Sequence, residues 1–296
     1  MKLIVPMSGL GSRFISAGYT APKPLIVVEG KPIIAHVLDM FPEVQDVTFI
    51  CNEDHLTNTP MREVLISLRP NATIISITSQ KLGPVHALTY AFDTLPDDKD
   101  VIVSYCDFTQ RWDFKAFQTK AAAKDFAGAV PAYTGFHPHL LRRNLYAGIQ
   151  ADKSGMMTAI QEKHCFTPNP EDSLHSSGIY YFSSGAILKK YSAKMIAEQN
   201  TLNGEYYVSM LYPYLLEDNL PVSVPPVTHF MQWGTPEDLE EYEAWSRLIH
   251  HDLNLVKHHT DIPTSRESLV TIPYSPESLE YKKSYTYWKE VIITNT

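Results

Sequence analysis

Residues 8–25 read SGLGSRFISAGYTAPKPL and directly follow the apolar run Leu-Ile-Val at 3–5. The run predicts a short buried strand that leads into a loop containing Gly9 and Gly11. Glycine lets an anion approach the backbone N–H groups and tolerates positive φ where a tight turn needs it. This segment therefore predicts an anion-binding loop at the end of the first strand.

Two cations accompany the loop. Arg13 brings a planar guanidinium two residues after Gly11. Lys23 stands between Pro22 and Pro24, which stiffen the backbone around it and hold its ammonium at low entropic cost. A glycine turn with two cations suits a polyphosphate. An ordinary tight turn with a solvated arginine and lysine is the alternative, because the spacing is neither that of a Walker A loop nor that of a dinucleotide fingerprint.

Composition places the chain among globular proteins. Its 296 residues are 44% hydrophobic and 20% charged, enough for one large core or two modest ones. The net charge of −8 argues against nucleic acid or an anionic membrane as the main partner. The three cysteines lack CxxC spacing, so they predict neither a disulfide framework nor a zinc site and suit a reducing cytoplasm. No segment approaches the length of a membrane span, so we expect a soluble protein.

Strands and helices alternate along the first 105 residues. The predicted strands are 3–6, 47–51, 73–77 and 101–105, and the predicted helices are 32–40, 61–68 and 85–95. This rhythm implies a mostly parallel sheet with helices on both faces. Beyond residue 128 the expected strands are 129–132, 146–150, 157–161 and 179–182, and the expected helices are 186–199 and 206–216.

Asp107 follows the predicted strand 101–105. Ligands of open α/β sheets bind beyond the carboxyl ends of the strands, so we expect Asp107 to face the glycine loop. A carboxylate there suits Mg²⁺, which prefers oxygen ligands and bridges protein and phosphate oxygens. A turn aspartate is the alternative. Asp113 is either a second acidic group of the site or the cap of a helix that begins near Phe114.

The opening segment resembles that of the sugar nucleotidyltransferases, whose first strand ends in a GxGxR loop followed by PKPL. The resemblance implies that Arg13 and Lys23 neutralise a triphosphate, and that Asp107 binds Mg²⁺ with a second acidic residue following at Asp113. It further implies a set of nucleotide-binding residues in this loop: Ser8, Gly9, Gly11 and Ser12.

A second nucleotide-binding segment is QKLGPVHA, residues 80–87. It resembles the family's glutamine and Leu-Gly turn, which pack against the nucleobase, and so implies roles for Gln80 and Gly83. The Gln80 amide is able to donate and accept hydrogen bonds at a base edge. Pro84 and Val85 stand where Thr-Ala is usual, and a polar helix start is the alternative interpretation.

Three segments resemble the acceptor-binding parts of the family. Glu162 and Lys163 resemble a pair whose lysine contacts the acceptor phosphate; a surface ion pair is the alternative. Gly178, in the segment SSGIY, resembles a strand entry where the acceptor lies against bare backbone. Glu205 resembles a glutamate that accepts hydrogen bonds from hydroxyls. A β-bulge and a glutamate at a helix N-terminus are the alternatives for these two.

Residues 231–239, MQWGTPEDL, resemble the family's closing motif. There an aspartate two residues before Gly-Thr-Pro-Glu supplies the other metal ligand, but this chain has Gln232 at that place. A neutral amide oxygen can coordinate Mg²⁺ or hold one of its waters, yet it adds no negative charge. We therefore expect lower metal affinity and a greater dependence on Asp107 and the nucleotide.

The resemblance covers roughly residues 1–249. It implies a single Rossmann-like, glycosyltransferase-A-type α/β domain with a mixed, mostly parallel sheet, followed by a C-terminal extension of unknown role at 250–296. The implied reaction joins a nucleoside triphosphate to a phosphorylated sugar or sugar-like molecule and releases pyrophosphate. Its usual setting is the cytoplasmic synthesis of bacterial surface-polysaccharide precursors. The partners are these two small molecules, with neither nucleic acid nor membrane, and a homo-oligomer stays open.

Two other functions stay open. A glycosyltransferase of the same general fold would use an NDP-sugar as donor, but Tyr105-Cys106-Asp107 lacks the first aspartate of the usual DxD. A non-catalytic, nucleotide-binding regulatory paralogue would explain Gln232. The histidines, among them His137, His139 and the pairs at 250–251 and 258–259, are expected to be solvated rather than metal ligands.

Overall fold

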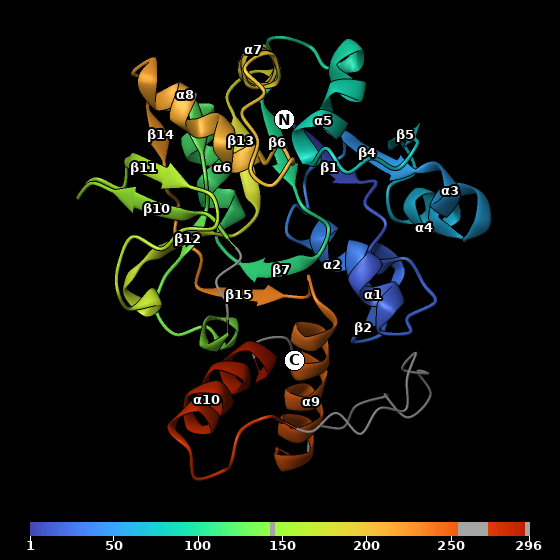
Figure 1. Cartoon of the computed structure of the whole chain (residues 1–296), viewed down its shortest axis with the longest axis vertical. Helices are drawn as coiled ribbons and strands as arrows, with labels where there is room; N and C mark the ends of the chain where they lie inside the picture. The colour runs from blue at the N-terminus through green and yellow to red at the C-terminus, as the bar shows by residue number, and fades with distance from the viewer. Residues whose placement is uncertain (143–145, 254–271, 294–296) are drawn as a thin grey trace.

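The computed structural model describes residues 1–142, 146–253 and 272–293. Its centre is a seven-stranded sheet in the order β14-β8-β13-β6-β1-β4-β5 (Figure 1). Its strands are β1 (Lys2–Met7), β4 (Val47–Asn52), β5 (Thr73–Ile77), β6 (Val101–Ser104), β8 (Gly128–Ala129), β13 (Ile179–Phe182) and β14 (Val222–Ser223). Four neighbouring pairs are parallel, and β13 is antiparallel to β6 and β8. The predicted mixed, mostly parallel sheet is confirmed.

Side chains of the central strands alternate between two cores, as the two-residue period of a strand requires. In β1, Leu3 and Val5 belong to one apolar cluster and Ile4 belongs to the other. Helix α2 (Ile33–Asp39) packs in the first cluster, whereas α5 (Pro84–Leu88) and α7 (Gly185–Ala197) pack in the second. Both faces of the sheet are therefore buried, which explains the continuous apolar runs of its strands.

The remaining helices before α9 are short. They are α1 (Ser12–Ser16), α3 (Glu53–Asn58), α4 (Met61–Leu68), α6 (Phe114–Ala122) and α8 (Tyr212–Glu217), with 3-10 helices η1 (Lys23–Leu25), η2 (Thr89–Thr94), η3 (Pro138–Leu141), η4 (Pro170–Asp172) and η5 (Val208–Leu211). Side-chain caps set several of their starts: Asp113 accepts a hydrogen bond from Ala116 N–H, and Ser184 accepts one from Ile187 N–H. Such caps satisfy backbone donors that have no partner within the helix.

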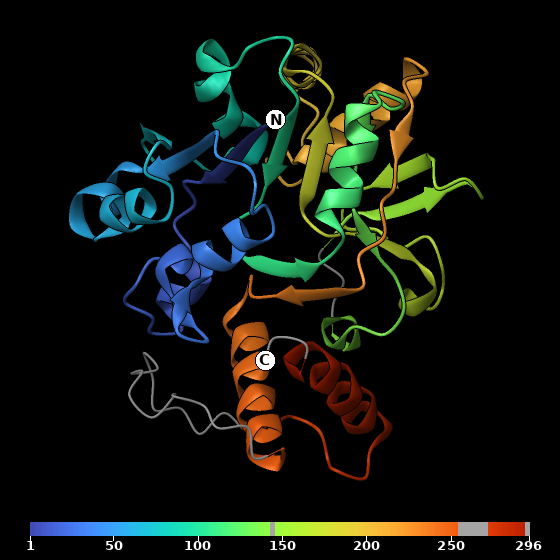
Figure 2. The ribbon, with the colours of Figure 1, turned by 180° about the vertical axis from the view of Figure 1, so that it is seen from behind.

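Three smaller sheets complete the fold. One has the order β11 (Met157–Gln161), β10 (Gly148–Ala151), β12 (Leu174–Ser176) and β9 (Ala132–Tyr133), and another is the hairpin of β2 (Val27–Val28) and β3 (Lys31–Pro32). The third joins β7 (Phe108–Arg111) to β15 (His229–Gln232), antiparallel, with Gln232 opposite Phe108. Figure 2 shows this ribbon between the main sheet and the C-terminal helices. It brings the segment after Asp107 against the closing motif.

Three predicted elements differ from the structure. The helix expected at 85–95 is α5 followed by the 3-10 helix η2, and the helix expected at 206–216 is η5 followed by α8. The strand expected at 129–132 divides into β8 and β9, which lie in different sheets. Pro131 stands between them, and proline has no N–H to continue a ladder.

The C-terminal part of the chain contributes two packed helices. Helix α9 (Pro236–Asp252) continues past residue 249, and α10 (Leu279–Ile293) lies beside it. The Tyr287 hydroxyl accepts from Phe230 N–H at 3.0 Å and donates to Phe230 C=O at 2.8 Å. Trp288 and Val291 join the core cluster of the main sheet. The division of the chain at residue 249 remains a prediction.

No helix in the described ranges is long and apolar enough to cross a membrane.

A buried histidine cluster corrects one expectation. His137 and His139 are 1% and 7% exposed, not solvated, because they pack around Tyr133 together with His175. The Tyr133 hydroxyl and His139 Nε2 are 2.8 Å apart. His250 is buried as well, and residues 258–259 lie outside the described ranges. Burial lowers the pKa of His137 to about 3 and the pKa of His139 well below its usual value.

This burial predicts a loss of stability in acid that depends on His137. A lowered folded pKa means that protonation favours the unfolded chain, so the stabilisation is complete above pH 6.5 and declines towards pH 3. Each depressed histidine contributes up to about 1.4 kcal/mol per pH unit in this window. Chemical denaturation between pH 7 and pH 4 should therefore show a shallower decline for His137→Phe than for the wild type. His251, 88% exposed, is the control, and an equal change in slope for His251→Gln would contradict the assignment.

Candidate active site

Strand β1 ends at Met7 and delivers the glycine loop to the carboxyl edge of the sheet. Ser8 is buried, and a Cβ placed on Gly9 would meet no atom of the described residues within 4 Å. The backbone at Gly9 is thus open to a ligand. A Cβ on Gly11 would lie 3.7 Å from the Cβ of Lys23, so the loop and the second cation are neighbours. Ser12 begins helix α1 and is exposed.

Lys23 is held beside Asp107. Its Nζ lies 2.8 Å from Asp107 Oδ2, and the two side chains are 17% and 27% exposed. Burial opposes the charged lysine, but the charge and hydrogen bond of Asp107 outweigh it and raise the pKa of Lys23. The Arg13 guanidinium acts in the opposite direction on the same pKa, which places a second positive charge within electrostatic range. The structure therefore brings together the two cations and the aspartate that the sequence singled out.

Asp107 also meets the closing motif. Its carbonyl accepts from Trp233 N–H at 2.9 Å, next to the pairing of Gln232 with Phe108. A Cβ on Gly234 would lie 3.1 Å from Asp107 Oδ2 and 3.7 Å from Gln232 Nε2. Asp107 and Gln232 therefore converge above Gly234, although 125 positions of the chain separate them.

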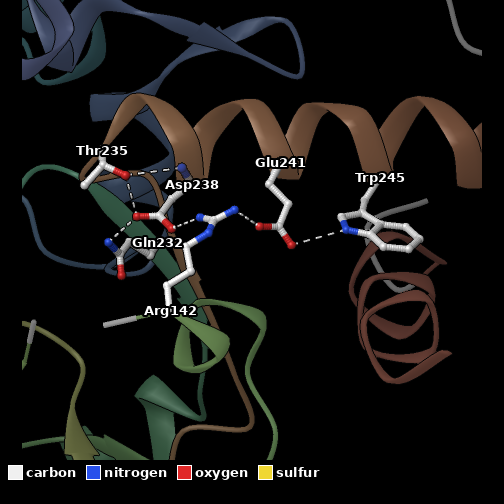
Figure 3. Close-up of polar contacts among 6 residues, drawn as sticks. All are labelled: Arg142, Gln232, Thr235, Asp238, Glu241 and Trp245. Carbon is white, nitrogen blue, oxygen red and sulfur yellow. Dashed lines mark hydrogen bonds and ion pairs between the residues drawn. The ribbon is translucent and has the colours of Figure 1, made fainter. Parts of the chain in front are cut away.

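The Gln232 amide is held by a charged network (Figure 3). Its Nε2 donates to Asp238 Oδ2 at 2.5 Å, and the Thr235 hydroxyl donates to the same oxygen at 2.7 Å. Arg142 donates to Asp238 Oδ1 at 2.6 Å and also pairs with Glu241, which accepts from the Trp245 indole at 3.4 Å. Burial raises the pKa of Asp238, while Thr235 and Arg142 oppose that shift.

The donor set fits a divalent cation that is partly held by its ligand. Among the described residues no group of three or more acidic, histidine or cysteine side chains gathers around one point. Asp107 supplies carboxylate oxygens, whereas the Gln232 atom nearest to this point is Nε2, which donates to Asp238. Mg²⁺ is commonly held by one or two carboxylates together with substrate phosphates, so Asp107 fits such a cation together with a bound nucleotide. Asp113 is not among these donors because its carboxylate caps helix α6.

The second nucleotide segment is tied to the acceptor half by backbone hydrogen bonds. Tyr206 N–H donates to Leu82 C=O at 2.9 Å, and Val85 N–H donates to Tyr206 C=O at 3.0 Å. Gly83 has φ 86°, and a Cβ on it would lie 2.7 Å from Tyr206 N, so this contact requires glycine. Gln80 donates to the Tyr90 hydroxyl at 2.7 Å, and its buried Oε1 has no partner among the described residues.

The predicted acceptor residues lie on neighbouring loops. Lys163 Nζ donates to the Tyr207 hydroxyl at 2.9 Å and lies 4.8 Å from the centre of that ring. Glu162 accepts from the Ser209 hydroxyl rather than pairing with Lys163. Burial and, as a smaller effect, the charge of Glu205 raise the pKa of Glu162, so the two glutamates lie within electrostatic range.

Gly178 borders the same region. It has φ 87°, and a Cβ there would lie 3.1 Å from Phe108 Cε1 and 3.5 Å from Tyr105 Cδ2. A side chain at this position would be strained and crowded. Its carbonyl accepts from Tyr105 N–H at 3.1 Å, which joins the strand entry to the segment that carries Asp107.

Several residues of the site escaped the sequence analysis. Tyr207 supports Lys163, and the Arg142–Asp238–Glu241 network holds Gln232. Asp238 lies in the acidic first turn of α9, which resembles an ordinary helix start in sequence. Arg142 is 96 positions away from Asp238, and no local pattern connects them.

The mixed α/β sheet, with a glycine loop after its first strand and an aspartate at its carboxyl edge, defines the class of nucleotidyltransferases. Residues 3–165, just over half of the chain, match the family model described as the MobA-like NTP transferase domain. The chain belongs to this family. The matched residues include Arg13, Lys23 and Asp107, whereas Gly178, Glu205 and Gln232 lie beyond them.

Known proteins resemble the chain over most of its length. It is 26% identical over 227 residues to the bifunctional protein GlmU of Ralstonia nicotianae. The matched region spans 75% of this chain and 46% of that protein. The chain thus matches about half the length of this curated relative. The crystal structure of a nucleoside-diphosphate-sugar pyrophosphorylase from Vibrio cholerae is 19% identical, with a TM-score of 0.66 over 80% of this chain and 97% of its own. The inositol-1-phosphate CTP transferase of T. maritima is 13% identical, with a TM-score of 0.60 over 80% and 90%.

Proposed function

We propose that this protein couples a nucleoside triphosphate to a phosphorylated sugar or sugar-like molecule and releases pyrophosphate. The observation that carries the proposal is the Lys23–Asp107 pair, held between the glycine loop and Gln232. A site with open backbone, two cations and oxygen donors suits a triphosphate with its metal ion. The names of the similar proteins, which include a nucleotide-sugar pyrophosphorylase and an inositol-phosphate CTP transferase, support this range of acceptors.

The proposed reaction is an in-line displacement at phosphorus. An oxygen of the acceptor phosphate forms a bond to the α-phosphorus of the nucleotide. The bond from the α-phosphorus to the oxygen that bridges to the β-phosphate breaks, and its electron pair leaves with pyrophosphate. Such chemistry needs positioning and charge neutralisation rather than a covalent nucleophile.

The chain's residues take separate roles in this scheme. Arg13 and Lys23 neutralise charge on the triphosphate, and Lys163 binds the acceptor phosphate. Asp107 would hold Mg²⁺, with Gln232 beside it, and the ion supplies further neutralisation of the phosphates when bound. Ser8, Gly9, Gly11, Ser12, Gln80 and Gly83 contact the nucleotide, and Glu162, Gly178 and Glu205 contact the acceptor. Surface-polysaccharide precursor synthesis in the cytoplasm is the setting we propose.

The experiment is a substrate panel. Five nucleoside triphosphates are combined with phosphorylated sugars and polyols, with Mg²⁺, and pyrophosphate is measured. Pyrophosphate release that needs one triphosphate and one acceptor together is the expected result. Triphosphate binding by calorimetry without pyrophosphate from any pair would instead identify a regulatory paralogue. Transfer from an NDP-sugar would identify a glycosyltransferase.

Lys163 and Lys23 are expected to affect different substrates. Because Lys163 lies on the acceptor side, Lys163→Ala should raise the KM for the acceptor about tenfold or more and leave the KM for the triphosphate within about threefold. Lys23→Ala should show the reverse pattern. Lys153→Ala, a change of an exposed lysine in the turn between β10 and β11, is the matched control. Equal effects of Lys163→Ala on both substrates would refute its assignment to the acceptor.

A further inference from the structure

A side chain of the C-terminal extension covers the outer edge of the β7–β15 ribbon. In a two-stranded ribbon, alternate residues of each strand turn their N–H and C=O groups outward, away from the partner strand. At Phe230 of β15 these two groups bond to one phenol: the N–H donates to the Tyr287 hydroxyl at 3.0 Å, and that hydroxyl donates to the C=O at 2.8 Å. Phe230 is 1% exposed and Tyr287 is 7% exposed. The Tyr287 hydroxyl therefore takes the place that a third strand would have at this position.

Helix α10, which carries Tyr287, also contacts β7. Arg111 of β7 donates to the Val291 C=O in the last turn of α10 at 2.8 Å. The carbonyls of a last helical turn have no partner within the helix, so an arginine is a fitting donor there. On the other strand, His229 Nε2 lies 3.4 Å from Glu290 Oε2 of α10. The helix thus holds both strands, and Figure 1 shows it beside the ribbon on the side away from the main sheet.

The ribbon ends at the candidate active site. Asp107 directly precedes β7, and Trp233 directly follows β15. Trp233 N–H donates to Asp107 C=O at 2.9 Å, so the pairing continues up to the aspartate that contacts Lys23. A two-stranded ribbon is only marginally stable without further support. A movement of β15 at Phe230, three positions before Trp233, would therefore displace the backbone that holds Asp107.

We propose that Tyr287 is a positioning residue of the active site: its hydroxyl fixes β15 at Phe230, and the β7–β15 ribbon transmits this constraint to Asp107. Tyr287 lies beyond residues 3–165, which match the family model, so the family match assigns it no role. Its effect on turnover rests on the proposed function. The proposal gives Tyr287 no contact with substrate or metal.

The decisive variant is Tyr287→Phe. It keeps the ring, which packs against Trp288 with 5.0 Å between the ring centres, and removes the hydroxyl that bonds to Phe230. Amide hydrogen exchange of the full chain is measured by mass spectrometry on two ribbon peptides, 105–111 and 229–233. Both should exchange about tenfold faster or more than in the wild type, because the ribbon opens more easily without its outer partner. Peptides from β1 and β4 should be unchanged.

Tyr212→Phe is the matched control for the loss of a buried hydroxyl. The Tyr212 hydroxyl lies 3.1 Å from Ala129 C=O and 2.9 Å from Tyr181 C=O, and the residue is 0% exposed. These partners belong to β8 and β13 of the main sheet. Both variants should lower the thermal midpoint, since each leaves buried backbone groups without a partner. Tyr212→Phe should nevertheless leave the exchange of both ribbon peptides unchanged.

Turnover distinguishes positioning from a loss of stability. Pyrophosphate release is measured well below both thermal midpoints. Tyr287→Phe should lower kcat about tenfold or more and leave the KM for each substrate within about threefold, because Arg13, Lys23 and Lys163 lie on other elements. Tyr212→Phe should keep kcat within about twofold of the wild type. A purely structural role would make the two variants alike.

Three results would each overturn the proposal: unchanged exchange of peptide 105–111 in Tyr287→Phe, an equal increase in Tyr212→Phe, or a Tyr287→Phe kcat within about twofold of the wild type. If Tyr287→Phe does not fold, Arg111→Met removes the contact with Val291 and should speed exchange in the same two peptides. Pyrophosphate release by the wild type together with unchanged exchange refutes the positioning alone. Faster exchange in Tyr287→Phe without pyrophosphate from the wild type refutes the proposed function and leaves the positioning of Asp107 standing.

Discussion

Asp107→Asn is expected to lower kcat by about a thousandfold or more, equivalent to about 4 kcal/mol of transition-state stabilisation. The change removes the charged oxygen donor at the carboxyl edge of the sheet and the partner of Lys23 Nζ, 2.8 Å away. The measurement is pyrophosphate release at saturating triphosphate, acceptor and Mg²⁺. Because the Lys23 side chain is only 17% exposed, the loss of its charged partner should also lower the thermal midpoint, so kcat is measured well below that temperature.

Asp113→Asn is the matched control for this prediction. It makes the same chemical change six positions further along the chain, where the carboxylate caps α6. Asparagine caps helices about as well as aspartate, so stability and turnover should both stay close to those of the wild type. An Asp107→Asn enzyme within tenfold of wild-type kcat, or an equal loss in Asp113→Asn, would remove Asp107 from the mechanism.

Arg13→Ala should lower kcat by about a hundredfold or more, equivalent to about 3 kcal/mol, if its guanidinium stabilises charge on the triphosphate at the transition state. The side chain is exposed on α1, and its positive charge acts to lower the pKa of Lys23, so the two cations lie within electrostatic range. The fold should survive because Arg13 contributes nothing to the buried core. Single-turnover measurements with saturating substrates separate this effect from a change in binding.

Arg247→Ala is the control for the loss of a positive charge. Arg247 is half exposed on α9 and pairs with Glu243 four residues earlier on the same helix. Such a surface pair contributes little to stability, so neither turnover nor the thermal midpoint should move appreciably. Near wild-type turnover in Arg13→Ala would exclude Arg13 from the reaction.

Much of the nucleotide half could be predicted because its signals are local. The strand at 3–6, the helix at 61–68 and the strand at 73–77 follow from the periodicity of consecutive apolar residues. The acceptor half is less regular. Pro131 divides one predicted strand between two sheets, and the predicted helix at 206–216 begins as a 3-10 turn. Turn chemistry and tertiary contacts outweigh periodicity in such short elements.

In the C-terminal region, the sequence did not indicate which side chains are buried in the main core. Helix α10 places Tyr287 and Trp288 in the main core, but its mixed composition gave no sign of this in the sequence. His137 and His139 were expected to be solvated, but both are buried. Histidine occurs both on surfaces and in interiors, and only the aromatic neighbours around Tyr133 distinguish the two.

The sequence by itself determined the first strand, the glycine loop that follows it and the proline-flanked Lys23, since these depend on residues adjacent in the chain. Only the tertiary structure decided that Lys23 contacts Asp107, 84 positions away. It also decided that Gln232 and Arg142 each donate a hydrogen bond to the Asp238 carboxylate. The physical reason is that side-chain hydrogen bonds and ion pairs act over about 3 Å. The register of β7 against β15 and the placement of α9 therefore had to be set before these partners could be identified.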